Sequence, residues 1–337
     1  MIYYFFIFQI LINFFLIKYF NIIAKKINLF DIPDQVRKTH KDKVAPIGGI
    51  IVFFNLLIFL IYNLINFFFI EKVLLNFKFD ELFFFYLFIS LFFIIGFIDD
   101  KLNISSTKKL FFFSLNIFLF LSINNIYVIE RLNFSFFSKT IDIAYVSFLF
   151  TILCYLLFIN AFNMYDGINL QSGLYAVFIF FIFLYKGIYV EISILIIISL
   201  IFFLYLNFKN KCFLGDNGSL LVSSIICYFF VKSSTTNNFF FPDEIFLIMM
   251  IPGIELLRLA FLRLLKGKHP FSADRNHIHH ILLNNFGLTK TIIILNLIVI
   301  LPYIFFIIFG QIIFIICFTL FIYSYLVVKY STQINSK

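Results

Sequence analysis

Long apolar runs constrain this chain more than any other feature. Of its 337 residues 63% are apolar and 13% charged, whereas soluble domains are roughly 45–50% apolar and about 25% charged. A helix needs roughly 20 mostly apolar residues to cross about 30 Å of hydrocarbon. Segments of that kind occur at 1–23, 47–70, 82–98, 110–128, 143–164, 168–185, 188–207, 213–231, 242–262, 291–309 and 311–328. We therefore expect an all-α, polytopic membrane helix bundle with about 10–11 transmembrane helices.

Two further readings follow from composition. The segment 1–23 lacks a charged leader and a small-residue cleavage site, so we expect it to stay as an anchor. Cys154, Cys212, Cys227 and Cys317 show no metal-ligand or CxxC spacing, which predicts buried free thiols. The 57 Phe residues accompany many Ile, Asn and Lys residues, a bias typical of A/T-rich codons, so no single Phe is given a functional meaning.

Basic residues predict the orientation of the chain. If the loop after the first span is cytoplasmic, that side holds 19 of the 26 Lys and Arg residues and the opposite side holds 6. This asymmetry follows the positive-inside rule and predicts an outside N-terminus and a cytoplasmic C-terminus. The formal net charge of +9 then needs no nucleic-acid partner, because basic loops lie beside anionic headgroups.

The organisation is predicted to be one integral membrane domain covering 1–337. No repeat of fixed period and no Pro/Gly/Ser linker occurs. The longest hydrophilic stretches, 24–46 and 263–290, are too short to bury a core of their own. Both are therefore expected to lie at the membrane surface and to function there.

Five polar clusters fall on the basic side. Each combines carboxylates with basic, imidazole or glycine residues. They are Asp31–His40 with Pro46–Gly49, Gly96–Lys101, Asn160–Asn169, Phe213–Ser219 and His269–His280. Carboxylates at a membrane boundary are costly unless they are paired or bind a metal, so each is a functional candidate.

The carboxylates also have a plainer interpretation. Asp99 or Asp100 could be a solvated residue that ends a helix, but two adjacent acids followed by a lysine disfavour it. Asp166 and Asp216 could lie in ordinary turns. Each has a glycine beside it, and a missing side chain lets a phosphate or metal approach the backbone.

The histidines could indicate zinc, since imidazole is a common ligand. If 277–280 are helical, His277 and His280 share a face while His279 points away, which disfavours a three-histidine metal site. Grouped with Arg275, the imidazoles suit an anionic substrate better, and a structural role stays open. Acids for a hard cation together with basic groups and glycine turns favour phosphoryl transfer with Mg²⁺, or with Mn²⁺ in its place.

The clusters resemble the motifs of the polyprenyl-phosphate N-acetylhexosamine-1-phosphate transferases, the superfamily that includes phospho-MurNAc-pentapeptide translocase. The likeness spans about 31–283, in the family order. It rests on Arg37-Lys38-x-His40 with Pro46-x-Gly48-Gly49, Asp99-Asp100, Asn163-x-x-Asp166-Gly167, Gly215-Asp216-x-Gly218-Ser219 and Asp274-Arg275-x-His277-x-His279-His280. The histidine string is similar to that of the branch that starts O-antigen or other cell-envelope glycans.

The resemblance implies a reaction and a place in the cell. A UDP-N-acetylhexosamine would give its sugar-1-phosphate to undecaprenyl phosphate and release UMP, at the cytoplasmic face of a bacterial inner membrane. The catalytic loops would lie near 24–46, 99–109, 163–169, 207–219 and 258–290. A second copy of the chain as a partner is left open.

The resemblance also implies roles for individual residues. Asp216 is the first candidate metal ligand, and Asp99, Asp100 and Asp166 share metal contact and base duty. Substrate binding falls to Arg37, Lys38, His40, Asn163, Gly215, Arg275, His277, His279 and His280.

Two positions depart from the family pattern. Asn169-Leu170 stands where many members have Asp and Gly, so no metal or base role passes to Asn169. Glu255 replaces a usual Asp, which leaves the contacts of its helix open.

Several alternatives remain at this stage. A related reaction would use UDP-MurNAc-pentapeptide as donor. From another class, a transporter or flippase would use intramembrane acids as ion relays, near the midplane and in two related halves. The sequence shows no such halves. Direct attack by the lipid phosphate and a covalent Asp intermediate also stay open.

Overall fold

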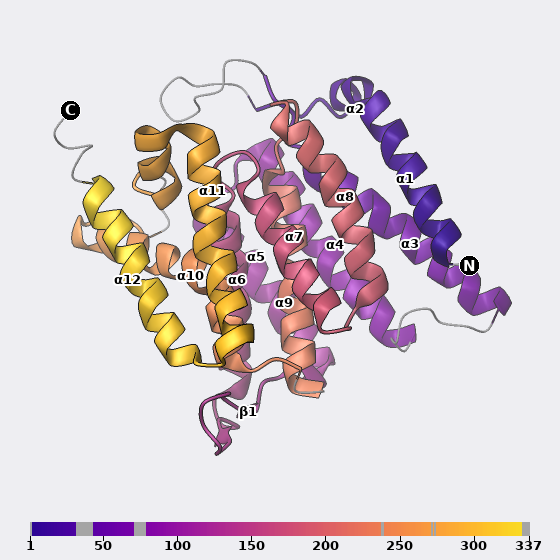
Figure 1. The fold of residues 1–337 in the computed structure, drawn as a ribbon. Coiled ribbons are helices and arrows are strands. Elements are labelled where there is room, and N and C mark those ends of the chain that lie inside the picture. Colours follow the sequence, from indigo (N-terminus) through magenta and orange to yellow (C-terminus); the bar gives the residue numbers. More distant parts are fainter. Residues whose placement is uncertain are drawn as a thin grey trace. The chain divides into compact units, whose positions relative to one another are not determined.

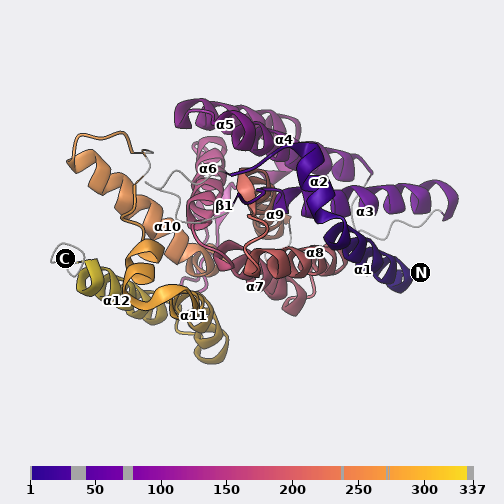
Figure 2. The ribbon, with the colours of Figure 1, turned by 90° about the horizontal axis from the view of Figure 1, so that it is seen from above.

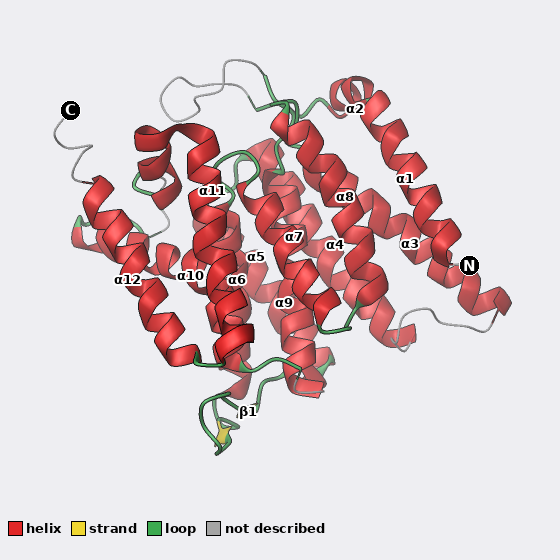
Figure 3. Ribbon diagram, in the orientation of Figure 1, coloured by secondary structure: helices red, strands yellow, loops and turns green. Residues whose placement is uncertain are grey.

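The computed structural model describes residues 2–31, 43–70, 79–236, 239–270, 272 and 274–331. Helices make up nearly all of the regular structure (Figure 3). The loop residues Arg37, Lys38 and His40 lie outside the described residues, so their predicted substrate contacts stay predictions.

The helices overlap all eleven predicted segments. They are α1 (Ile2–Lys18), α2 (Phe20–Ile27), α3 (Gly48–Ile70), α4 (Phe79–Leu102), α5 (Ser106–Ile123), α6 (Ser147–Tyr165), α7 (Gln171–Tyr185), α8 (Val190–Phe208), α9 (Gly215–Thr236), α10 (Pro242–Leu265), α11 (Ile278–Phe309) and α12 (Ile312–Ser331) (Figure 1). An antiparallel pair, β1 (Arg131–Leu132) and β2 (Ile141–Asp142), joins α5 to α6. The all-α, polytopic prediction is confirmed.

The number of spans lies at or just below the lower end of the predicted 10–11. Among the described residues, nine helices are long and apolar enough to cross a membrane, or ten if α1 and α2, bent by 68°, form one span. The predicted span at 168–185 is left out of both counts. Its helix, α7, has 15 residues, which at 1.5 Å per residue gives only about 22 Å.

The chain divides into two compact units. Unit 1 comprises Met1–Asn116 and Ala176–Ile226, and unit 2 comprises Ile117–Tyr175 and Cys227–Lys337. The division passes through α5, α7 and α9.

Unit 1 packs α1 and α3 on α8, and α1 and α8 lie side by side in both ribbon views (Figures 1 and 2). Buried amides connect these helices. Asn13 and Asn55 donate to each other at 2.8 and 3.1 Å, and Gln9 donates to the Leu195 carbonyl at 2.8 Å. Such interhelical hydrogen bonds stabilise helix pairs where the surroundings are apolar.

Unit 2 packs α10 on α6, α11 and α12, and α11 and α12 lie side by side in Figures 1 and 2. α11 begins at Ile278, inside the stretch predicted to be hydrophilic. It is broken at Gly287, whose φ of 73° is left-handed and therefore favours glycine. The predicted span 291–309 is the part of α11 that follows this break.

The cysteines are all free, as predicted. Cys212 and Cys227 are buried and Cys154 is half-buried, whereas Cys317 is exposed. The prediction of burial is wrong for Cys317, because this residue lies on a face of α12 that no described helix covers.

Candidate active site

The site in unit 1 is built where two loops pair. The Phe213 N–H donates to the Ala45 carbonyl at 3.1 Å, and the Gly48 and Gly49 N–H groups donate to the Phe213 and Leu214 carbonyls at 3.0 Å. These bonds set the start of α3 beside the start of α9. The first and fourth polar clusters, far apart in the sequence, therefore meet.

Asp100, at the end of α4, caps α9. Its oxygens accept the Asp216 and Asn217 N–H groups at 2.9 Å each and the Asn217 side-chain amide at 2.5 Å. That amide also donates to the Pro46 carbonyl at 2.6 Å. The first N–H groups of a helix lack partners within it, and its positive dipole end favours a carboxylate. Asp100 thus joins the second cluster to the first and fourth.

Glycines permit this close approach. Gly215 has a φ of 76°, and a Cβ on it would meet the Pro46 carbonyl, the Asn217 amide and the Asp100 carboxylate within 3 Å. A Cβ on Gly96 would overlap the backbone of Asp216. Gly215 was predicted to bind substrate. Its left-handed backbone and the lack of space for a Cβ already require a glycine at this position.

A lysine joins the remaining two acids. The Lys109 ammonium forms an ion pair with Asp99 Oδ2 and contacts Asp216 Oδ2 at 2.9 Å. Asp99 is 3% exposed, and its other oxygen accepts the Ile104 N–H at 2.7 Å. The Asp216 side chain is 32% exposed, so a ligand can reach it. Lys109, on α5, was counted in the sequence only as a basic loop residue.

The two acids fit a divalent cation. They already hold one cationic group, the Lys109 ammonium, between them. Within the described ranges, no three His, Cys, Asp or Glu side chains gather closely enough to hold a metal ion. Mg²⁺ is commonly bound by one or two carboxylates, substrate phosphates and water. The donor set therefore suits a metal bound together with a phosphate ligand.

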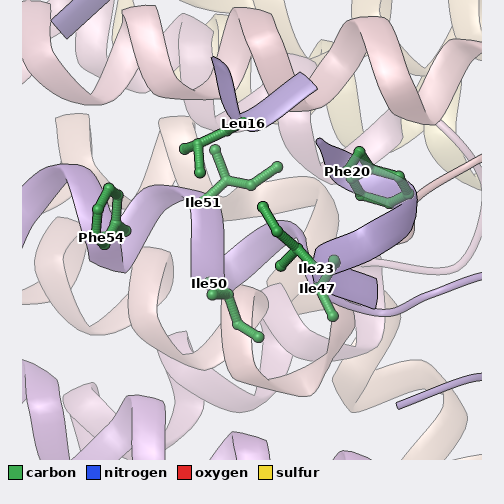
Figure 4. A pocket seen from close by; sticks show the side chains of 7 residues that line it. All are labelled: Leu16, Phe20, Ile23, Ile47, Ile50, Ile51 and Phe54. Atoms are coloured by element: carbon green, nitrogen blue, oxygen red, sulfur yellow. The ribbon is translucent and has the colours of Figure 1, made fainter. Parts of the chain in front are cut away.

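Unit 1 also contains an apolar cavity of about 310 Å³ (Figure 4). Side chains from α1, α2, α3 and the residue before α3 line it: Leu16, Phe20, Ile23, Ile47, Ile50, Ile51 and Phe54. A lining without polar groups suits hydrocarbon and does not suit a phosphate or sugar.

Unit 2 brings the third and fifth polar clusters together. Asp166 ends α6 and accepts a short hydrogen bond from the Ser172 hydroxyl. At the next residue, a Cβ on Gly167 would overlap the ring of His279. His279 is 1% exposed, so the absent side chain of Gly167 leaves space for this buried ring. Asn163 lies one turn earlier on α6.

The three imidazoles form a group. The ring centroid of His279 lies 5.0 Å from that of His277 and 4.4 Å from that of His280, and the third pair is 6.1 Å apart. The prediction that His279 points away from the other two is wrong. It assumed a helix through 277, whereas His277 is extended (φ −63°, ψ 143°) and α11 begins one residue later.

Arg263 holds the loop before these histidines. Its guanidinium, on a side chain 5% exposed, donates to Asp274 Oδ2 and to the Pro270 carbonyl, each at 2.7 Å. Partial burial would raise the pKa of Asp274, but the hydrogen bonds from Arg263 and Asn276 and the charge of Arg263 outweigh it and lower that pKa. Arg275 is exposed. Sequence reasoning missed Arg263, because it follows directly after the expected span 242–262 and belongs to none of the motifs.

His277 is neutral near pH 7. Burial is the main cause that lowers its pKa from 6.5 to about 4. Its Nε2 lies 3.5 Å from Arg263 Nη2, and a guanidinium can only donate, so this contact favours the proton on Nδ1. Among the described residues, Nδ1 of His277 and Nδ1 of His279 have no hydrogen-bond partner. Both atoms are buried, so each ring keeps one nitrogen whose hydrogen-bonding capacity is unused in this arrangement.

Comparison with known proteins agrees with these motifs. Residues 82–234 match the family glycosyl transferase family 4. The chain is 29% identical over 296 residues to an undecaprenyl-phosphate alpha-N-acetylglucosaminyl 1-phosphate transferase of Thermotoga maritima, covering 85% of this chain and 84% of that protein. Proteins of the same name from Yersinia pestis and Escherichia coli O157:H7 are 28% and 27% identical, each covering 77% of this chain and 71% of the relative. The resemblance is confirmed, because residues 82–234 match the family and proteins of this name align with most of the chain.

Proposed function

We propose that this protein transfers N-acetylhexosamine-1-phosphate from a UDP-sugar to undecaprenyl phosphate, forming undecaprenyl-diphospho-sugar and releasing UMP. The observation that carries the proposal is the centre in unit 1, where Asp99 and Asp216 share the Lys109 ammonium beside an N-terminal helix turn capped by Asp100. The relatives' names support the same reaction class.

Charge neutralisation is the main requirement of this reaction, because a phosphate and a diphosphate must meet. A divalent cation, Mg²⁺ by the preference for carboxylate ligands, would be held by Asp99 and Asp216 and would neutralise phosphate charge there. Lys109 would turn its ammonium to a substrate phosphate. Asp100 would hold the end of α4 against the start of α9, since its oxygens accept backbone N–H groups of α9.

The bond changes follow from retention of the sugar–oxygen bond. An oxygen of the lipid phosphate attacks the sugar-bound β-phosphorus, a new P–O–P bond forms, and the bond from the β-phosphorus to the bridging oxygen breaks, so UMP leaves with that oxygen. A phosphate monoester has a second pKa of about 6. The nucleophile is therefore already mostly dianionic near pH 7, and a general base adds little.

The unit 2 cluster would bind the donor. His277 is neutral and grouped with His279 and His280, and the His279 ring is held against Gly167. Neutral donors orient phosphate or sugar oxygens without adding charge. Arg275, exposed beside them, would add a positive charge for the diphosphate.

One assay tests the proposal. Purified protein is mixed with undecaprenyl phosphate, radiolabelled UDP-GlcNAc and Mg²⁺, and label in the lipid and release of UMP are measured. We expect both to appear in equal amounts. Absence of labelled lipid with every UDP-sugar tried, including UDP-MurNAc-pentapeptide, contradicts the reaction. A transporter or flippase would move substrate without forming a new bond.

We also propose that the site faces the cytoplasm of a bacterial inner membrane, with the N-terminus outside. The excess of Lys and Arg in the loops that carry the motifs supports this orientation. Single cysteines placed beside Asp99 or His277, on a background without native cysteines, should resist impermeant thiol reagents in intact cells. Labelling of either cysteine from outside would contradict the proposed orientation.

A further inference from the structure

The start of α11 is capped from another helix. A helix leaves its first four N–H groups without internal partners, and the N-cap residue His277 forms no side-chain capping bond. Instead, the Ile278 N–H donates to Glu255 Oε1 of α10 at 2.7 Å. Glu255 is 3% exposed. The position at which α11 begins therefore depends on a side chain 23 residues earlier in the sequence.

Arg258 fixes the other side of the same turn. Its guanidinium forms two hydrogen bonds with Glu255, at 2.7 and 3.1 Å. It also donates to the Asn276 carbonyl at 2.6 Å. The residues on both sides of His277 are therefore held by one ion pair. A buried carboxylate is costly without such a partner, so the pair is expected to stay together.

α12 completes the arrangement through Tyr323. This tyrosine is 3% exposed. Its hydroxyl donates a short hydrogen bond to Glu255 Oε2 and accepts one from Arg258 Nε at 2.9 Å. Both oxygens of the buried carboxylate are thereby satisfied. A residue near the C-terminus, far outside the family match at 82–234, thus contacts the pair that holds the histidine loop.

We propose that Glu255, Arg258 and Tyr323 are positioning residues that orient His277, His279 and His280 for donor binding. The inference rests on the proposed function for the donor, while the positioning of the loop can be tested without it. The backbone at 276–278 sets the direction of the His277 ring and the start of the first turn of α11. A shift there would move the His279 ring relative to Gly167. The two already lie so close that a Cβ on Gly167 would overlap the ring.

A matched pair of tyrosines makes the test sharp. Tyr303, on α11, is also 3% exposed and donates to a buried glutamate, Glu244, at 2.9 Å. Tyr323→Phe and Tyr303→Phe each remove one hydroxyl from a buried Tyr–Glu pair. Both should lower the thermal midpoint, and Tyr323→Phe should lower it more, because its hydroxyl also accepts the Arg258 Nε–H. Only Tyr323→Phe should affect the histidine loop.

Two measurements follow. Hydrogen exchange by mass spectrometry of a peptide covering 276–286 should be about two- to tenfold faster in Tyr323→Phe, the range expected when the Tyr323–Glu255 hydrogen bond no longer supports the loop. In the transfer assay its donor KM should rise by a similar factor, with the lipid KM little changed. Tyr303→Phe should match wild type in both. Equal behaviour of the two variants in exchange would overturn the inference.

Glu255→Asp gives a second test that keeps the charge. The shorter side chain should lose its reach to the Ile278 N–H, and we expect faster exchange and a donor KM at least as high as in Tyr323→Phe. Wild-type exchange and wild-type kinetics in Glu255→Asp would overturn the positioning role. If wild type transfers no sugar phosphate, the proposed function fails, while the exchange measurement still decides whether these residues hold the loop.

Discussion

The two polar clusters satisfy their charges in different ways. In unit 1, Asp99 and Asp216 are held by an ammonium, and Asp100 is held by backbone and amide N–H groups. In unit 2, the imidazoles are grouped, and two of their nitrogens have no partner among the described residues. The first arrangement handles charge, and the second presents neutral groups that can orient a ligand.

This difference predicts two kinds of kinetic effect. Groups that balance charge as it moves in the transition state should affect kcat, because electrostatic stabilisation is the largest contribution to such reactions. Groups that orient the donor should affect donor KM as well. The experiments below test that division, from the largest expected effect to the smallest.

The largest loss is expected for Asp216→Asn. Asp216 is one of the two carboxylates that would hold a cation, so its removal should lower kcat roughly 10²–10³-fold or more. Activity of the wild-type protein should also require a divalent cation. Turnover of the purified variant, with and without a chelator, is the measurement. Asp80→Asn, an exposed acid at the other end of α4, is the control. Undiminished turnover of Asp216→Asn would remove it from the centre.

The next effect is expected for Lys109→Met, which leaves Asp99 and Asp216 without their shared cation. We expect kcat to fall roughly 10²-fold, in line with the loss of one charge-stabilising group, and Lys109→Arg to recover part of it. Lys108→Met changes an exposed neighbour and should stay near wild type. Equal activity of the two Met variants would mean that Lys109 only stabilises the fold.

A smaller effect, mainly on binding, is expected in unit 2. His280→Gln, His279→Gln and Arg275→Lys should each raise the donor KM by roughly three- to tenfold, since each alters a hydrogen bond or charge contact worth about 1 kcal/mol. The lipid KM should change little. His269→Gln, exposed in the same loop, is the control. An effect confined to kcat would break the proposed division between the two clusters.

The last prediction concerns stability and not kinetics, and it is a pH dependence from His277. Burial lowers its pKa from 6.5 to about 4, so between these values the unfolded chain binds a proton that the folded protein does not. Stability is full above pH 6.5 and falls toward pH 4, by at most about 3 kcal/mol. His277→Gln should flatten this fall, measured as the thermal midpoint in detergent at about pH 7.5 and about pH 5.

Asp274 should lose its stabilising effect at a lower pH than His277, so the two contributions to acid sensitivity can be told apart. Its pKa is lowered below 3.8, so its stabilisation is present above that value and lost only as pH falls further. A decline between pH 6.5 and 4 that persists in His277→Gln would therefore come from another group.

The sequence predicted most residues of the candidate site, but it did not predict the contacts between them. Asp99, Asp100, Gly215 and Asp216 were recognised because polar residues at the ends of apolar helices are rare and costly. Lys109 was missed as a member of the site, since one more basic residue in a cytoplasmic loop carries no separate signal. The same holds for Arg263, which looks like any charge at a helix end.

The sequence by itself determined an all-α membrane protein, the approximate limits of its helices and the identity of its polar clusters, because hydrocarbon thickness and the cost of burying charge act on local composition. Only the tertiary structure decided which clusters meet. Long-range contacts such as Asp100 with α9, Gly167 with His279, and Glu255 with Tyr323 depend on helix packing and on glycines that permit close approach. Where α11 starts was likewise decided by a carboxylate on another helix, because its own N-cap residue offers no capping bond.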